Sequence, residues 1–284
     1  MREKFIEKLI KFYLPLCIFL FVLLFPFYWM FITAFKSDME LYNLKLNPFF
    51  IHQPTLRNVI MLFTETLFNR WMLNTFFVSI LATLLSLGAS LLAAYAIQRL
   101  RFRSSGTIGI SIFFSYLVPP TILFIPLATI IFELKIWDSL WSLVLIYPTF
   151  LIPFCTWLLM GYFKSIPKEM EECAMIDGAS RFRIFWQIVV PLALPGILSA
   201  GIFAFTLSWN EFLYALTFIS TTTQKTVPVG LITELVRGDV YHWGPLMTGA
   251  LLASVPVALV YSFFVEHYVA GMTGALKEQL PWLK

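Results

Sequence analysis

Charged residues are what this sequence has least of. Only 13% of its 284 residues are Asp, Glu, Lys or Arg, whereas 59% are hydrophobic. A soluble domain carries about 25% charged residues, so this chain has too few of them to cover a water-facing surface. The composition excludes an ordinary soluble domain and predicts an integral membrane protein whose solvent is the lipid bilayer.

Motifs for catalysis and metal binding are also missing. The three cysteines, Cys17, Cys155 and Cys173, are scattered, lack metal-ligand spacing and do not suggest a disulfide framework. The three histidines are dispersed, and neither His-Glu-x-x-His nor Gly-x-Ser-x-Gly occurs. No Gly-Lys pair is present, although a phosphate-binding loop requires one. We therefore expect no enzymatic activity, no metal and no cofactor in this chain. Any process that it drives across the membrane must take its energy from another subunit or from a gradient.

The apolar residues gather into long runs, at positions 12–34, 73–97, 107–132, 139–163, 196–220 and 245–265. A helix rises 1.5 Å per residue, so runs of this length can cross a hydrocarbon core of about 30 Å. No small-residue cleavage site follows the first run, which predicts a retained span. The sequence thus predicts an all-α membrane protein with six transmembrane helices in one domain, 12–269. Interior prolines, such as Pro119-Pro120 and Pro153, are expected to kink these helices.

The distribution of Lys and Arg predicts the orientation. The tails 1–11 and 270–284, together with segments 98–106 and 164–195, carry 13 Lys and Arg residues, against 7 in the other segments. Cytoplasmic segments are enriched in these residues, so we expect both termini and the loop 164–195 of this multi-pass membrane protein to be cytoplasmic. The long segments 35–72 and 221–244 would lie outside, either as connections on the headgroups or as a surface for an external partner.

The loop 164–195 has the composition of a folded segment. Pro167 suits a first helical turn, and three glutamates follow it where a helix dipole favours negative charge. Asp177-Gly178 indicates a break, and Ser180 can cap a second helix. We therefore expect two short helices joined at Asp177-Gly178. The loop is too weakly basic for a typical interfacial anchor, which favours docking of another protein over contact with lipid headgroups.

This loop resembles the signature of permease subunits of ATP-binding-cassette importers: Glu-Ala-Ala, three residues, Gly, nine residues, Ile, one residue, Leu-Pro. The positions that match are Glu172, Ala174, Gly178, Ile188 and Pro191, whereas Cys173 replaces the first alanine and Val190 the leucine. The segments Asp177-Gly178-Ala179, Trp209-Asn210-Glu211-Phe212 and the tail from Gly271 to Lys277 are similar to the carbohydrate-uptake, maltose-type branch. The resemblance extends from the first span to Lys277.

The resemblance implies a type I importer permease of the cell inner (plasma) membrane that works by alternating access. The loop would be a coupling helix seated in a cytoplasmic ATPase subunit. The apolar residues of the loop, which by their type suit the pockets of a docked protein, would then contact that subunit; they are Met175, Ile176, Phe182 and Phe185. The implied partners are a second, related permease in a heterodimer, two copies of the ATPase and an extracytoplasmic solute-binding protein, besides the lipid bilayer and without nucleic acid. ATP and magnesium would bind at the ATPase subunits. The implied solute is a di- or oligosaccharide, or glycerol phosphate.

Two further sets of residues are candidates for a role in transport. Glu211 lies in the fifth run beside Trp209 and Asn210, where a charge costs about 2.5–3.5 kcal/mol at the bilayer centre and should face the protein interior or a watery cavity. It is either a residue of the translocation path or a structural hydrogen-bond partner between helices. In the C-terminal tail, Gly274 and Lys277 either enter the ATPase interface or belong to a loose, solvated end.

Three other functions remain open from the residues alone. A gradient-driven transporter would more often show inverted repeats and several charged residues along its path, whereas Glu211 is nearly alone here. A membrane-embedded enzyme would need a catalytic cluster, and a scaffold would need only a docking surface.

Overall fold

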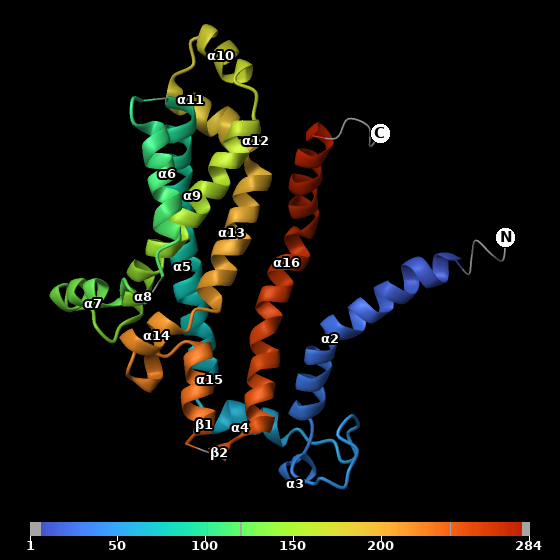
Figure 1. The fold of residues 1–284 in the computed structure, drawn as a ribbon. Coiled ribbons are helices and arrows are strands. Elements are labelled where there is room, and N and C mark those ends of the chain that lie inside the picture. The colour runs from blue at the N-terminus through green and yellow to red at the C-terminus, as the bar shows by residue number, and fades with distance from the viewer. Residues whose placement is uncertain (1–6, 101, 120, 239, 280–284) are drawn as a thin grey trace. The chain divides into compact units, whose positions relative to one another are not determined.

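The computed structural model describes residues 7–279 apart from 101, 120 and 239. Their side chains are described except at 237 and 265–279. The chain divides into two compact units, Met1–Asn69 with Gly230–Pro256 and Arg70–Val229 with Val257–Lys284. Almost every element is a helix, as the composition predicts (Figure 1).

The first unit begins with a long apolar helix. A π-helical turn, Leu9–Tyr13, runs into α2 (Leu14–Ala34). Residues buried in α2 occur only in its last turn, at Ile32, Thr33 and Ala34. Most of the other side chains of α2 are exposed, many of them phenylalanine and leucine, which suits a helix surrounded by lipid.

Two segments distant in the sequence complete this unit. The first contains α3 (Asp38–Leu41) and α4 (Arg57–Thr64), and the second contains the paired strands β1 (Val236–Arg237) and β2 (Val240–Tyr241) and the start of α16 (Trp243–Gln279). Asn58, in the first turn of α4, donates through Nδ2 to the carbonyl oxygens of Ala34, at 2.9 Å, and Lys36, at 2.8 Å. These hydrogen bonds tie α4 to the end of α2.

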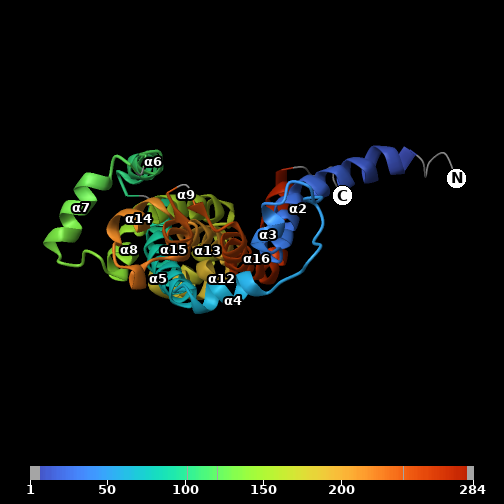
Figure 2. The ribbon, with the colours of Figure 1, turned by 90° about the horizontal axis from the view of Figure 1, so that it is seen from below.

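The second unit holds the main bundle. Its first half contains α5 (Phe68–Tyr95), a π-helical turn at Ala96–Leu100, α6 (Ser105–Tyr116), α7 (Phe124–Glu133), α8 (Leu140–Ile146) and α9 (Pro148–Ser165). Its second half contains α10 (Glu169–Ile176), α11 (Arg181–Ile184), a π-helical turn at Phe185–Val189, α12 (Val190–Leu192), α13 (Leu194–Trp209), α14 (Leu213–Phe218), a 3₁₀ turn at Thr222–Gln224 and α15 (Val227–Leu235). Helix α5 begins just before this unit, and α15 ends in the first unit. Helix α9 packs against both α6 and α13. Seen from below, α7 projects away from the helices around α9 (Figure 2).

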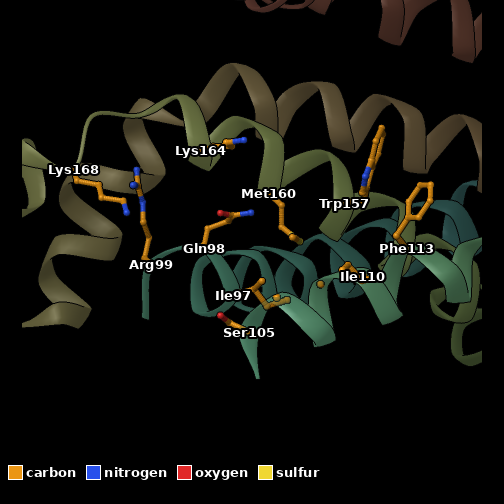
Figure 3. Close-up of a pocket in the computed structure, with 12 residues that line it drawn as sticks. Ile97, Gln98, Arg99, Ser105, Ile110, Phe113, Trp157, Met160, Lys164 and Lys168 are labelled. Carbon is orange, nitrogen blue, oxygen red and sulfur yellow. The ribbon is translucent and has the colours of Figure 1, made fainter. Parts of the chain in front are cut away.

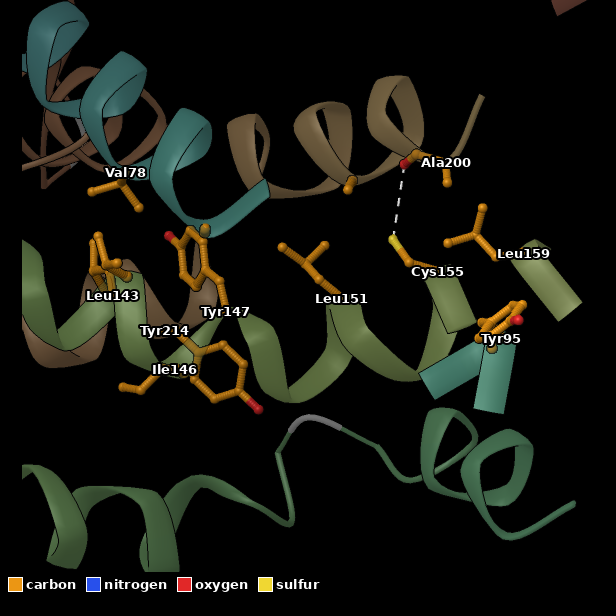
Figure 4. Close-up of a cluster of buried hydrophobic side chains, with 14 of the residues drawn as sticks. Val78, Tyr95, Leu143, Ile146, Tyr147, Leu151, Cys155, Leu159, Ala200 and Tyr214 are labelled. Carbon is orange, nitrogen blue, oxygen red and sulfur yellow. Dashed lines mark hydrogen bonds between the residues drawn. The ribbon is translucent and has the colours of Figure 1, made fainter. Parts of the chain in front are cut away.

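The core of this unit lies where α5, α9 and α13 meet (Figure 4). Leu151, Cys155 and Leu159 follow one face of α9 and are fully buried. Cys155 Sγ lies 3.8 Å from the carbonyl oxygen of Ala200 on α13. On α5, the small residue Ser90 is buried and its hydroxyl donates to Ile152 O at 3.1 Å. Small side chains let these helices approach closely.

The apolar runs and the helices do not correspond one to one. Four helices are long and apolar enough to cross a membrane in the part of the chain that the structure describes: Leu9–Ala34, Phe68–Leu100, Leu140–Ser165 and Trp243–Phe264. A fifth candidate is the pair Arg181–Leu192 and Leu194–Trp209, bent by 74°.

The run 107–132 is not one helix, and its prolines explain the break. The run is divided between α6 and α7. Two consecutive prolines, Pro119 and Pro120, remove two backbone donors there and stop helix propagation. The run 196–220 is likewise divided, between α13 and α14.

Candidate functional site

The loop 164–195 folds as two short helices, α10 and α11, joined at Asp177-Gly178. Gly178 has a φ of 81°, a left-handed conformation that glycine adopts readily. The Ala179 N–H then donates to Ala174 O at 2.9 Å, closing the end of α10. Ser180 caps α11 by accepting a hydrogen bond from the Arg183 N–H at 3.3 Å. The predicted pair of helices is therefore confirmed.

The two faces of this α10–α11 segment differ in exposure. Ala174, Ala179 and Ile188 are half-buried and pack against the core of the second unit. The other motif residues are exposed, namely Glu172, Cys173, Met175, Asp177, Gly178 and Pro191. Large apolar side chains stand beside them, with Ile176 86% exposed and Phe182 74% exposed. An exposed apolar surface of this kind is typical of a protein-binding site.

A buried ion pair fixes the inner face of α10. Arg99 Nε lies 2.8 Å from Glu171 Oε1, with only 3% and 7% of the two side chains exposed. Arg99 Nη2 also donates to Ile166 O at 2.7 Å. Arg99 belongs to the π-helical turn that ends α5, and turns of this type are frequent at functional sites. The pair ties the α10–α11 segment to the end of a long apolar helix.

Sequence reasoning did not find this pair. It assigned Arg99 to the charge bias of the membrane flanks and Glu171 to the dipole of α10. The two residues are far apart in the chain, and only packing brings them together. The available signal was an arginine and a glutamate on the same expected side of the membrane, which is too common to select one pair.

Glu211 lies in the break between α13 and α14 and is half-buried. Its carboxylate accepts hydrogen bonds from the Tyr214 N–H at 2.8 Å, the Ala215 N–H at 3.0 Å and the Tyr147 hydroxyl at 2.9 Å. The carboxylate thus caps the start of α14 and joins it to the α8–α9 junction. Of the two roles open for Glu211, this geometry directly supplies the structural one.

The neighbours of Glu211 point into different surroundings. Trp209 is buried, and its ring lies 4.7 Å from that of Phe76 and 5.4 Å from that of Phe205. Asn210 is exposed, and its Nδ2 donates to Thr206 O at 2.9 Å. The structure therefore does not gather Trp209, Asn210 and Glu211 around one surface, and a role for them in the translocation path stays a prediction.

The C-terminal candidates lie in the last turns of α16. The backbone at Gly274 and Lys277 is helical, whereas the Lys277 side chain falls outside the described part of the chain. Among the residues that the structure describes, no three His, Cys, Asp or Glu side chains come together as metal ligands would.

Residues 86–274 match the family described as "Binding-protein-dependent transport system inner membrane component". The chain belongs to this family. It is therefore a multi-pass transport protein of the inner membrane. The family expected from the coupling motif is confirmed.

Curated relatives of this family cover nearly the whole chain. The sulfoquinovosyl glycerol transport system permease protein SmoH of Agrobacterium fabrum is 38% identical over 256 residues, which is 89% of either chain. The trehalose/maltose transport system permease protein MalG of Thermococcus litoralis is 32% identical over 260 residues, 90% of this chain and 92% of the relative. These relatives are transport permeases, in agreement with the absence of catalytic motifs.

A solved structure shows the same fold. One chain of a bacterial ABC transporter involved in the import of the acidic polysaccharide alginate superposes with a TM-score of 0.80. The match covers 94% of this chain and 98% of that chain at 20% sequence identity. The predicted all-α fold of an importer permease is confirmed, whereas the number of spans and the side of the termini stay predictions.

Proposed function

We propose that this chain is the membrane-spanning permease subunit of an ATP-driven importer that carries a sugar into the cytoplasm by alternating access. The observation that carries the proposal is the α10–α11 segment, which exposes the motif residues and is anchored by the Arg99–Glu171 pair. A partner that moves this segment would move the end of α5 with it.

Other subunits complete the proposed importer. We expect a second, related permease, two ATPase copies that bind ATP and magnesium, and an extracytoplasmic solute-binding protein. A second alginate-importer structure supports the last of these, because it is a complex with an alginate pentasaccharide-bound periplasmic protein, with a TM-score of 0.67 to this chain. With both termini and the α10–α11 segment in the cytoplasm, the ATPase copies would meet the motif residues directly.

Sugars are favoured as the solute because the relatives' names point to them. Their printed solutes are sulfoquinovosyl glycerol, trehalose or maltose, and, for a Streptomyces coelicolor relative that is 30% identical, diacetylchitobiose. We therefore propose a di- or oligosaccharide or a related glycoside. Glycerol phosphate is the second candidate.

Reconstitution tests this function. The complete importer in proteoliposomes, supplied with its binding protein and a labelled disaccharide, should accumulate sugar when ATP is enclosed with the ATPase subunits. A matched complex whose ATPase cannot hydrolyse ATP should not. Uptake that needs no ATP but is abolished by an ionophore would show a gradient-driven transporter instead, and uptake of glycerol phosphate in place of sugars would correct the solute class.

A further inference from the structure

A cavity of about 520 Å³ lies between α6, α9 and the end of α5 (Figure 3). This volume is within the range of small-molecule sites, about 300–1,000 Å³. The residues that line it are Ile97, Gln98, Arg99, Ser105, Gly106, Gly109, Ile110, Phe113, Trp157, Met160, Lys164 and Lys168. None of them belongs to the coupling motif or to the candidate translocation path.

The lining is polar at one end and apolar at the other. On α9, Lys164, Met160 and Trp157 are spaced by four and three residues, so they share one helix face. Seven residues of helix span about 10 Å, which separates the lysine from the tryptophan by that depth. Figure 3 shows this order, with Lys168 and Lys164 toward one end and Trp157 and Phe113 at the other.

Two lysines give the polar end its positive charge. Arg99 is already neutralised by Glu171 at 2.8 Å. Lys164 is exposed and Lys168 is half-buried, and among the described side chains neither has a carboxylate within ion-pair distance. The polar end of the cavity therefore offers two ammonium groups to an anion.

The apolar end opens toward the surroundings of the helices. Ile110 is 60% exposed and Trp157 52% exposed, so this end is not closed by the rest of the unit. Gly106 lies one helical turn before Ile110, at the start of α6, and a Cβ built there meets no atom within 4 Å. A molecule with a charged head and a long apolar tail would match both ends of the cavity.

We propose that this cavity binds an anionic phospholipid of the surrounding bilayer. Its phosphate lies between Lys164 and Lys168, and the first part of one acyl chain follows Met160, Phe113 and Trp157. Basic pockets between membrane helices recognise anionic headgroups in this way. In the orientation proposed above, the lipid comes from the cytoplasmic leaflet, close to the α10–α11 segment, because Lys168 directly precedes α10.

Native mass spectrometry of the complete purified importer tests this site. The importer is stripped of lipid and titrated with phosphatidylglycerol or with phosphatidylcholine of the same acyl chains. We expect one phosphatidylglycerol to be retained at least about tenfold more tightly, since each lysine near an anionic headgroup strengthens binding severalfold. The double variant Lys164→Gln/Lys168→Gln should lose this preference, whereas Lys8→Gln/Lys11→Gln, which removes two charges elsewhere, should keep it.

A second variant separates loss of the lipid site from misfolding of the protein. Gly106→Leu leaves both lysines in place and adds a large side chain to the lining of the cavity, where a Cβ meets no atom within 4 Å, so the assembled importer should form while retention falls. Equal retention of the two lipids, or an unchanged preference in Lys164→Gln/Lys168→Gln, would overturn the proposal. Full displacement of the lipid by millimolar inorganic phosphate would identify a free-phosphate site, and cross-linking of Gly106→Cys to another subunit would identify a protein occupant; either result also overturns it.

Discussion

Individual charges are prominent in this protein because the chain has so few of them. Arg99 and Glu171 are almost completely buried, yet they face each other at 2.8 Å. Removing two charges from water is costly, and a buried pair is stable only as long as both partners are present. The pair is therefore better understood as a device that fixes the position of α10 than as a source of net stability.

Substitution of Arg99 separates these two contributions. Arg99→Met leaves Glu171 buried without a counter-charge and should lower the free energy of unfolding by about 3–5 kcal/mol. The double variant Arg99→Met/Glu171→Leu should regain most of that loss but should uncouple ATP hydrolysis from solute uptake. Thermal unfolding of the purified importer and the ratio of ATP hydrolysed to solute transported measure the two effects. A double variant as unstable as Arg99→Met would contradict this account of the pair.

Asp138 is a second charged residue with a defined task, in the loop before α8. It accepts hydrogen bonds from the Ser220 N–H at 2.8 Å, the Thr221 N–H at 2.9 Å and the Thr221 hydroxyl. Burial acts to raise the pKa of Asp138, but these hydrogen bonds outweigh it and hold the pKa below its usual value. The carboxylate therefore ties the start of α8 to the segment after α14 in its charged form.

The lowered pKa of Asp138 predicts a pH dependence. A carboxyl group whose pKa is lower in the folded state contributes stability above its unfolded pKa, about 3.9, and loses it as the pH falls through the folded value. The melting temperature of the wild type should therefore exceed that of Asp138→Asn by a constant amount from pH 7 to about pH 5, and the difference should shrink below about pH 4. Asparagine tolerates the left-handed φ of 54° at this position, so backbone strain does not confuse the comparison. A difference independent of pH would refute the assignment.

The breaks between helices determine where α11 and α14 begin and in which direction each runs. Gly178 turns the chain between α10 and α11, and Glu211 starts α14 after α13 has ended. Each break depends on one residue with a particular property, a permissive backbone in the first case and a capping carboxylate in the second. A change at either residue should therefore alter an element more than it alters the core.

At Gly178 the backbone requirement can be separated from side-chain bulk. A Cβ has open space around it there, but the φ of 81° costs most residues about 1–2 kcal/mol. We expect Gly178→Val to weaken copurification of the ATPase subunit while membrane insertion stays normal. Gly178→Asn, which accepts the left-handed backbone, should retain more ATPase. Wild-type recovery of the ATPase with Gly178→Val would count against the coupling assignment.

At Glu211 the path role and the capping role predict different results. If Glu211 belongs to the path, Glu211→Gln should reduce solute uptake with little loss of assembled importer. Tyr147→Phe is the matched variant, because it removes the hydroxyl that donates to the carboxylate at 2.9 Å without touching Glu211 itself. Solute uptake by the reconstituted importer reports the path role, and the melting temperature of the importer reports the capping role. Normal uptake by Glu211→Gln would leave Glu211 with a structural role alone.

At the scale of the whole molecule, the first unit joins parts of the chain that the sequence keeps far apart. Tyr42 Oη donates to Tyr241 O at 3.0 Å, and Gly244 lies so close to Asn58 that a Cβ there would approach Asn58 Nδ2 to 2.4 Å. The long segments expected on the outer side are thus folded together, in favour of a built surface over loose connections. Docking of the solute-binding protein on that surface stays a prediction.

Buried charge also stabilises the segment between α2 and α4. Glu40 accepts from the His52 N–H at 2.8 Å and from the Gln53 N–H at 3.1 Å. Burial acts to raise the pKa of Glu40, but the hydrogen bonds from His52 and Gln53 and the nearby Lys36 charge lower it overall. The carboxylate holds together backbone groups of a segment that has little regular structure.

The sequence by itself determined the class, the family and the local form of the α10–α11 segment. Membrane insertion follows from composition, and the turn at Gly178 and the cap at Ser180 depend on neighbours within a few residues. Such signals are local, so they can be recognised without knowing the packing.

Only the tertiary structure decided which residues act together. It paired Arg99 with Glu171, joined the Glu211 carboxylate to the Tyr147 hydroxyl and set Lys164 and Lys168 along one cavity. Each of these depends on contacts between helices whose relative rotation the sequence does not specify. Hydropathy identifies a helix as apolar. Because lipid and the protein interior are equally apolar, hydropathy does not show which face of the helix contacts a neighbouring helix.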